Sequence, residues 1–167
     1  MPNWCECNLC VSGDVKELKK FKEQAKGLDE AKGKTDLSLN NFVPTPPELL
    51  DRSAPNDVDP EAMKAKYKMA DWYTWRNKNW GTKWDIEAEI TDEKPFELWY
   101  YFSSAWSPPA GAIETIARLF PKLKFSLDYC EPGMGFKGQF VVKKDKIIEN
   151  YTRNITPKEY KAMEDGD

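Results

Sequence analysis

Apolar and polar residues alternate in several short stretches of the chain, which is the pattern of strands with one buried face. In WCECNLCVS, residues 4–12, one face carries Cys5, Cys7, Leu9 and Val11. In KWDIEAEI, the apolar face would comprise Trp84, Ile86, Ala88 and Ile90. KLKFSLDY alternates in the same way. ELWYYFSS is predicted to be a strand because it is rich in β-formers and follows a turn, and QFVVKK and KIIENY are predicted to be strands after a glycine turn.

Two amphipathic stretches lie between these strands and predict helices. Asp14 is placed to cap the first helix, with Glu17 three residues later. The second, SPPAGAIETIARLFP, has prolines at its start and ends at Pro121. The predicted apolar sides are Leu18, Phe21, Ala25 and Leu28 in the first helix, and Ile113, Ile116, Ala117 and Phe120 in the second.

The pattern is interrupted after the first helix. Residues 28–80 are punctuated by prolines, and they indicate one short helix, capped by Asp59, with Pro60 in its first turn. We interpret 28–80 as an insertion within a single domain that spans residues 1–167.

Without this insertion the predicted order of elements is β-α-β-β-α-β. This order is typical of an α+β, ferredoxin-like fold, an antiparallel sheet with both helices on one face. Extra strands follow, and Thr156 with Glu159 predicts a capped last helix.

Composition narrows the class of protein. With 40% hydrophobic residues in 167, the chain can bury its own core. A net charge of -3 argues against a nucleic-acid partner. No apolar run is long enough to span a membrane, and the N-terminus lacks the pattern of a signal peptide. We therefore expect a cytoplasmic protein with reduced cysteines.

The chain contains no histidine, which removes the commonest general base and the Ser/His and Cys/His nucleophile pairs. A carboxylate-dependent enzyme is the remaining catalytic alternative, but the acidic residues fall mostly on an exposed strand face without a nucleophile motif. We expect no enzymatic activity and no cofactor.

The motif CECNLC suggests a zinc site, with Cys130 as a fourth ligand. Strand alternation argues against it, because Cys5 and Cys7 share the apolar face while Cys10 and Cys130 point to the other face. We expect four free thiols and no metal. GMGFKG, residues 133–138, fits the dinucleotide fingerprint in letters only, because strands flank it on both sides and predict a hairpin turn.

The face of the sheet opposite the helices is predicted to be acidic and aromatic. Trp4, Trp99 and Tyr101 point outward there, among carboxylates and with Lys124 as the one predicted cation. Such a surface would repel phosphates and suits a basic protein partner. The predicted partner-binding residues are Glu6, Asp85, Glu87, Glu89, Trp99 and Tyr101; the insertion is a second candidate surface.

The motif NWGTKW, residues 79–84, offers an alternative small-ligand site for a nucleotide-like compound. By strand parity Trp84 belongs to the core, whereas Trp80 precedes the strand and is freer to stack on a ligand. Gly81 allows close approach, and Lys83 could meet an anion. Trp80, Gly81, Lys83 and Trp106 would form this pocket; packing of the insertion onto the sheet is the competing interpretation.

Several motifs together resemble the YubB-like proteins carried by phages and plasmids: MPNWC, NLCVSG, NWGTKW, AWSPP and YCEPGMGFKG. The resemblance spans most of the chain, and residues 32–71 are its least distinctive part. It implies a ferredoxin-like C-terminal part, a mobile-element origin, a bacterial cytoplasm and, by analogy, interference with a host defence or regulatory system. It implies no catalytic residues. We therefore expect a non-enzymatic binding protein that engages a host macromolecule.

Overall fold

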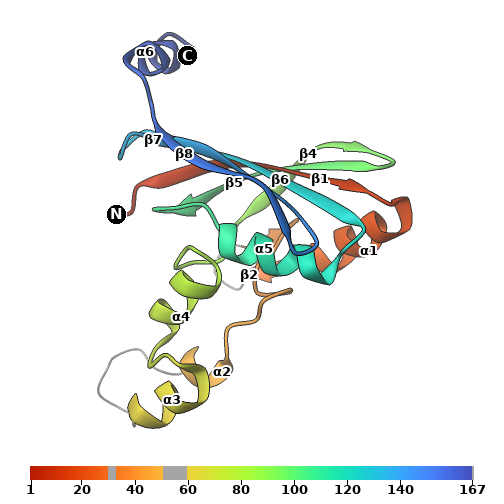
Figure 1. Ribbon diagram of the computed structural model, residues 1–167, viewed down its shortest axis with the longest axis vertical. Helices are drawn as coiled ribbons and strands as arrows, with labels where there is room; N and C mark the ends of the chain where they lie inside the picture. The colour runs from red at the N-terminus through yellow and green to blue at the C-terminus, as the bar shows by residue number, and fades with distance from the viewer. Residues whose placement is uncertain (30–32, 51–59, 167) are drawn as a thin grey trace.

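The structure, a computed structural model, describes residues 1–29, 33–50 and 60–166 of the chain (Figure 1). Strands and helices follow the predicted order, with short additional elements in the insertion. In chain order they are β1 (Trp4–Gly13), α1 (Val15–Ala25), β2 (Gly27–Asp29), β3 (Gly33–Thr35), α2 (Pro47–Leu50), α3 (Pro60–Tyr67), α4 (Trp72–Asn79), β4 (Ala88–Lys94), β5 (Glu97–Ala105), α5 (Ala110–Leu119), β6 (Leu123–Glu131), β7 (Phe136–Lys143), β8 (Lys146–Asn154) and α6 (Pro157–Asp165).

The main sheet has six strands in the order β4-β5-β1-β6-β7-β8, and every neighbouring pair is antiparallel. β1, α1, β4, β5, α5 and β6 form the predicted β-α-β-β-α-β unit, with the first and third strands, β1 and β5, in its centre. The ferredoxin-like fold is therefore confirmed. β7 and β8 extend the same sheet beyond β6.

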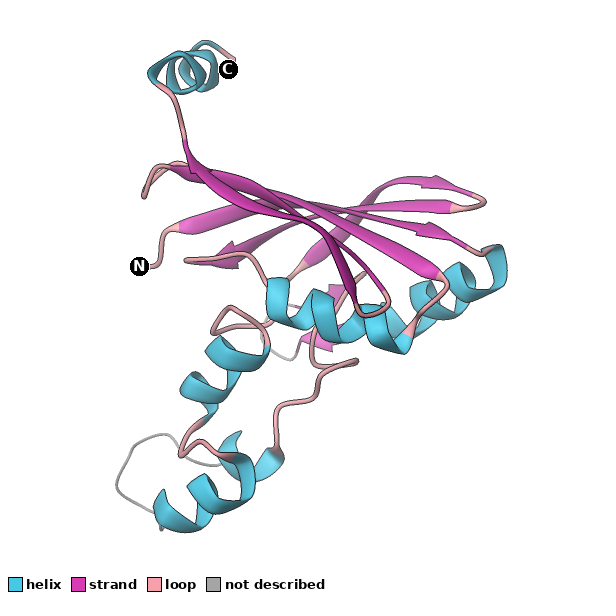
Figure 2. Ribbon diagram, in the orientation of Figure 1, coloured by secondary structure: helices cyan, strands magenta, loops and turns pink. Residues whose placement is uncertain are grey.

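The core lies between the sheet and helices α1 and α5, which cover one face (Figure 2). Alternate strand residues point into it, as the period-two pattern requires. Phe21 of α1 stacks on Phe42 and makes edge contacts with aromatic rings of the sheet and of residue 120. Fully buried members include Cys5, Cys7, Leu9, Val11, Ala25, Tyr100, Ile113, Ile116, Phe125 and Leu127.

The sequence pattern predicted the start of α1 correctly but placed its end too late. The Asp14 carboxylate accepts hydrogen bonds from the backbone N–H groups of Lys16 and Glu17, which confirms the predicted cap. The helix ends at Ala25, however, so Leu28 belongs to β2 and not to the helical stripe. The predicted cap Asp59 lies outside the described residues.

The described parts of the insertion lie mainly on the helix side of the sheet (Figure 1). They reach the sheet at the outer edge of β4. There Asp36 donates its backbone N–H to the carbonyl of Ala88, and the Asp36 carboxylate accepts the N–H of Ile90. The Thr35 hydroxyl accepts the N–H of Ala88. The insertion therefore satisfies backbone groups of β4 that a neighbouring strand would otherwise bind.

These contacts correct the predicted strand in KWDIEAEI, because β4 begins only at Ala88. The Asp85 carboxylate accepts the backbone N–H of Ile86 and those of Leu39 and Asn40 in the insertion. Residues 84–87 therefore follow the insertion instead of continuing the pleat, and strand parity does not apply to Trp84.

Candidate functional site

The face of the sheet opposite α1 and α5 is open, with α6 standing over one end (Figure 2). We call it the open face. Every second side chain along each strand points to this face and not to the core. Cross-strand pairing aligns them in rows. One row runs Glu89, Tyr101, Asn8, Asp128, Gln139, Tyr151, and the next continues Ser103, Glu6, Cys130, Lys137, Arg153.

An open hollow of about 720 Å³ occupies the β4–β5–β1 corner of this face. Its acidic lining comes from Glu6, Asp36, Glu87 and Glu89, and among the described residues Lys34 is the one basic residue that lines it. Trp4, Tyr101 and Ser103 also line it. Four of the six predicted partner-binding residues thus meet at one place: Glu6, Glu87, Glu89 and Tyr101.

The glutamates of this acidic hollow are available to a partner. Glu6, Glu87 and Glu89 are exposed, and no described residue forms a hydrogen bond or ion pair with their carboxylates. Asp36 differs, because its carboxylate already holds the N–H of Ile90. Carboxylates without a partner in the chain keep their full capacity to accept hydrogen bonds from a cation.

Exposed aromatic rings border the acidic hollow. Trp4 and Trp84 are 41% and 36% exposed, and their ring centroids are 6.1 Å apart. The Lys83 ammonium lies 4.2 Å from the centroid of the Trp84 ring. This contact shows that the aromatic surface accepts a cation at one ring face.

The other two predicted partner-binding residues lie elsewhere. Trp99 is on the open face, but one row beyond the hollow, opposite Cys10, and its indole N–H donates to the Glu97 carboxylate. Asp85 is not on the sheet at all. Besides the three backbone N–H groups, its carboxylate accepts the Ser38 hydroxyl, so Asp85 fastens the insertion to the chain before β4.

Trp80 is fully buried, which corrects the expectation that it is the freer of the two tryptophans in NWGTKW. Its indole N–H donates to the Val43 carbonyl, at 2.8 Å, and its ring packs edge-on against Trp75. The Arg76 guanidinium covers the ring, 4.7 Å from its centroid. Both faces and the polar edge of Trp80 therefore belong to the interior that joins insertion and core.

The other residues of the predicted small-ligand pocket do not gather around Trp80 as a pocket, and each has its own contacts near the junction of the insertion and the core. Gly81 has φ 88°, and a side chain there would meet the Pro108 carbonyl at 3.0 Å, so close packing against the start of α5 explains the glycine. Lys83 is engaged with Trp84. Trp106 is 44% exposed at the end of β5, where its backbone N–H donates to Asn3. Packing of the insertion is thus the better account of NWGTKW.

The cysteines divide between the two faces as strand parity predicts. Cys5 and Cys7 are buried, and Cys10 and Cys130 are partly exposed on the open face. Burial raises the pKa of the Cys7 and Cys130 thiols. Burial and the hydrogen bond to Glu97 raise the pKa of Cys10 to about 12, so it is a protonated donor at neutral pH. Within the described ranges, no three Cys, Asp or Glu side chains gather as a metal site.

Cations of β7 and β8 were missed by the sequence reasoning, which placed only Lys124 on the open face. Lys137, Lys143 and Arg153 share that face with Lys124 through the registers of β6, β7 and β8. Strand alternation would have located them once β7 and β8 were taken as part of the same sheet. The open face therefore carries the acidic hollow at its β4 side, where Lys34 and Lys94 are also present, and a second group of cations at its β8 side.

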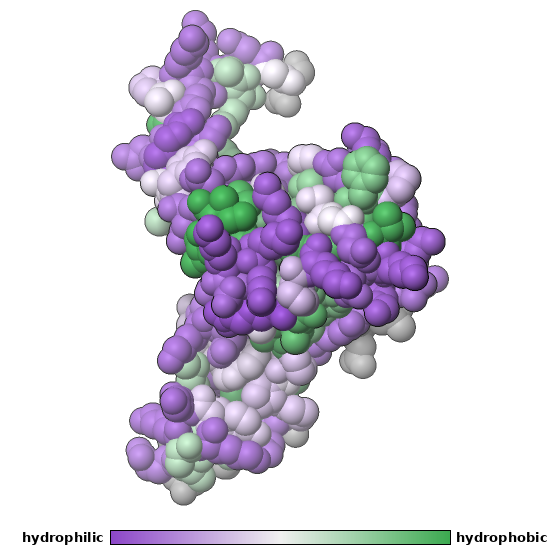
Figure 3. Space-filling model, turned by 45° about the vertical axis from the view of Figure 1, so that its right-hand side comes forward, coloured by the Kyte–Doolittle hydropathy of each residue, from purple (hydrophilic) through white to green (hydrophobic). Residues whose placement is uncertain are grey.

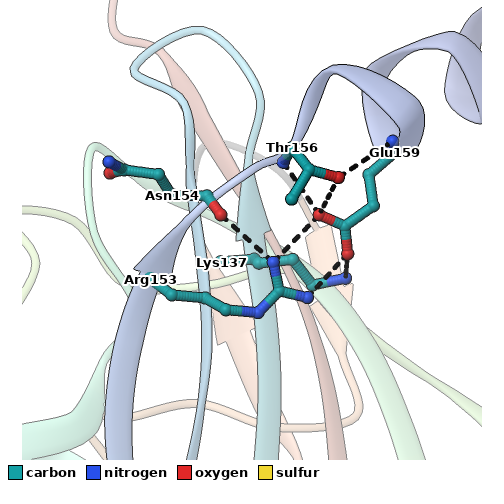
Figure 4. Close-up of polar contacts among 5 residues, drawn as sticks. All are labelled: Lys137, Arg153, Asn154, Thr156 and Glu159. Carbon is teal, nitrogen blue, oxygen red and sulfur yellow. Dashed lines mark hydrogen bonds and ion pairs between the residues drawn. The ribbon is translucent and has the colours of Figure 1, made fainter.

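Two of these cations fasten α6 to the sheet (Figure 4). Arg153 donates from Nη1 and Nη2 to the two oxygens of the Glu159 carboxylate, at 2.9 and 2.6 Å, and Lys137 approaches it at 3.4 Å. The same carboxylate accepts the backbone N–H of Thr156, which completes the predicted capping box. The hydrogen bonds from Arg153, followed by those from Thr156, hold the pKa of Glu159 well below its ordinary value of 4.5.

We expect the docking of α6 to depend on pH in an acidic window. Because the folded-state pKa of Glu159 is lowered, its stabilising contribution is complete above pH 4.5 and is lost as the pH falls toward the folded-state value. Amide hydrogen exchange should show α6 still protected at about pH 4 and released at lower pH. Glu159→Gln keeps an acceptor for the capping box but cannot titrate, so its α6 should show no such transition. An unchanged transition in this variant would assign the pH dependence to another group.

Exposed apolar side chains on the face drawn in Figure 3 form small patches separated by hydrophilic ones. Across residues 1–29, 33–50 and 60–166, no helix combines the length and apolar character needed to cross a bilayer. The acidic hollow brings exposed carboxylates and aromatic rings together in one place, so it is the candidate site that the geometry defines best.

The fold and the open face together define a ferredoxin-like α+β protein in which one face of the sheet is uncovered. A family model described as "Ferredoxin-like domain in Api92-like protein" matches residues 79–165, more than half of the chain. The protein belongs to this family. A search of curated proteins found no match.

Among solved structures, the chain is similar to the crystal structure of the protein Api92 from Yersinia pseudotuberculosis, with a TM-score of 0.59. The similarity covers 94% of this chain and 100% of that chain at 10% sequence identity. Such a distant likeness establishes a shared fold.

Proposed function

We propose that this protein is a non-enzymatic binding protein whose acidic hollow engages a basic segment of a host protein. The observation that carries the proposal is the convergence of Glu6, Glu87 and Glu89, without partners among the described residues, around Trp4 and Tyr101 in one open hollow. Lysine and arginine side chains pair with carboxylates and stack on aromatic rings, so a basic segment matches both components.

The setting of this function is also a proposal. The motifs NWGTKW, AWSPP and YCEPGMGFKG support a relationship to the YubB-like proteins of phages and plasmids. A protein of that origin would act in the bacterial cytoplasm, and binding a basic host protein would suit a role against a host defence or regulatory system. Nucleic acid suits the hollow poorly, because phosphates would meet carboxylates.

The small-ligand alternative at NWGTKW has no comparable support, because the ring of Trp80 is enclosed by Trp75, Arg76 and Val43. Carboxylate catalysis likewise has no specific support, since the glutamates of the acidic hollow are exposed to solvent and no nucleophile accompanies them.

Charge reversal in the hollow tests the proposal. We expect Glu87→Lys/Glu89→Lys to weaken binding of a fluorescent arginine-rich peptide by at least about tenfold, or about 1.4 kcal/mol, in anisotropy titrations. Raising the salt concentration should weaken binding to the unmodified protein.

The matched control is Glu23→Lys/Glu164→Lys, which changes the net charge equally on exposed residues of α1 and α6. Binding should stay within about twofold of the unmodified protein in this control, because distant surface charges are screened. Equal losses in the two double variants would mean that the peptide responds to net charge alone, and the hollow would be abandoned as the site.

A further inference from the structure

The two edges of the main sheet differ in how their backbone groups are satisfied. At β4, Thr35 and Asp36 of the insertion bind the backbone of Ala88 and Ile90, as described above. At β8, the sheet order gives β7 as the one neighbouring strand within the described residues, and all nine residues of β8 are exposed. An uncovered edge of this length is a template for a further strand.

The direction of the backbone groups along β8 follows from one contact. The carbonyl of Tyr151 accepts a hydrogen bond from the Tyr129 hydroxyl of β6, so it faces β7 and the sheet interior. In an antiparallel ladder the N–H and C=O of one residue point to the same side, and the side alternates along the strand. Asn150 and Thr152 therefore direct their backbone groups toward the free edge.

The side chains of this edge are complementary to a second copy of themselves. Antiparallel pairing about a two-fold axis at Tyr151 places Asn150 opposite Thr152 of the second copy, with their outward backbone groups facing each other. The same register places Glu149 opposite Arg153 of the second copy, twice. Moving the axis to Asn150 would instead set Glu149 against Tyr151 and leave no opposite-charge pair.

Both charged residues are able to make this contact. No described residue binds the Glu149 carboxylate. Arg153 uses Nη1 and Nη2 for Glu159 and for the Asn154 carbonyl, and no described residue accepts from its Nε. The register irregularity near Ile147 confines the regular part of the edge to residues 149–154, which is the stretch that this pairing uses.

We infer that β8 pairs antiparallel with β8 of a second copy of this chain, around a two-fold axis at Tyr151, so that the two main sheets become one continuous sheet. Isologous pairing of this kind is self-limiting, since it consumes the free edge of both copies. The acidic hollow lies at the opposite edge and stays open in the dimer, so this inference does not depend on the proposed function.

Sedimentation velocity of the full chain tests the association. We expect a monomer–dimer equilibrium between about 1 μM and 1 mM, because pairing over so few residues gives a small interface. Glu149→Arg sets like charges opposite each other twice and should raise the dissociation constant at least about tenfold. A protein that stays monomeric over this range would overturn the inference.

Cross-linking tests the register. In a background of Cys10→Ser/Cys130→Ser, which removes the two partly exposed thiols, Tyr151→Cys should form a disulfide-linked dimer on oxidation. Facing residues of a non-hydrogen-bonded pair have Cα atoms about 4.5 Å apart, within the range that a disulfide spans. Glu149→Cys faces Arg153 of the second copy and should remain uncross-linked. Cross-linking through Glu149→Cys but not Tyr151→Cys would overturn this pairing, and unchanged thermal unfolding of each variant would show that the fold is intact.

Discussion

Replacing Trp80 by alanine is expected to lower the free energy of unfolding by about 4 kcal/mol, within the range seen when large buried side chains are truncated. Trp80 is fully buried at the junction of the insertion and the core. The change would open a cavity against Trp75 and Arg76 and leave the Val43 carbonyl without its donor. Cavity formation and an unsatisfied carbonyl act in the same direction.

Urea unfolding followed by circular dichroism measures this loss. Trp80→Phe keeps much of the apolar volume and loses the indole N–H. Its stability should therefore lie between those of the unmodified protein and Trp80→Ala, with a loss of about 1–2 kcal/mol in the free energy of unfolding. Trp106→Ala removes an exposed indole and should change stability by no more than about 0.5 kcal/mol. If Trp80→Ala were no more destabilising than Trp106→Ala, Trp80 would not be part of the core.

Much of the fold could be predicted because its signals are local. A half-buried strand repeats every two residues, so β1 and β6 were evident from alternation, and β5 was evident from its β-forming residues after a turn. The caps of α1 and α6 act between residues at most three positions apart, as Asp14 does with Glu17 and Thr156 with Glu159. Such contacts are visible in the sequence because both partners lie within one turn.

The exchange of roles between Trp80 and Trp84 could not be predicted in this way. It depends on where β4 begins, and that is set by the hydrogen bonds that the Asp85 carboxylate accepts from residues of the insertion, 46 positions away in the case of Leu39. Likewise, nothing local indicates that the indole of Trp80 meets the Val43 carbonyl, 37 positions away. Parity fails when a distant segment, and not the neighbouring strand, binds the backbone.

The candidate site was predicted in part for the same reason. Glu6 and Tyr101 lie on regular strands, so alternation placed them correctly on the open face. Glu87 lies before β4, and it reaches the acidic hollow because the chain there follows the insertion. Asp85, two residues earlier, is drawn away by the same contacts. One carboxylate therefore serves the fold and its near neighbour remains available for binding.

Loss of the Asp85 carboxylate and loss of the Glu87 carboxylate should therefore differ in their effect on stability. Asp85→Ala should lower the free energy of unfolding by about 3 kcal/mol, because the carboxylate accepts four hydrogen bonds and bonds to a charged group are the stronger ones. Since Asp85 is only partly buried, water replaces some of these bonds, and the loss stays below their sum. Glu87→Ala, at an exposed residue without a described partner, should change stability by no more than about 0.5 kcal/mol.

Asp85→Asn refines the comparison, since the amide keeps one oxygen that can accept from Leu39 and Ile86 but replaces the other by an NH₂ group. That group cannot accept from the Ser38 hydroxyl or the Asn40 N–H, so we expect an intermediate loss of about 1–2 kcal/mol. Urea unfolding gives the three values, and hydrogen exchange at residues 38–40 should report local opening in the Asp85 variants only. Equal stability of Asp85→Ala and Glu87→Ala would return Asp85 to the candidate binding residues, whereas the expected order separates the carboxylate that fastens the insertion from those that are exposed in the acidic hollow.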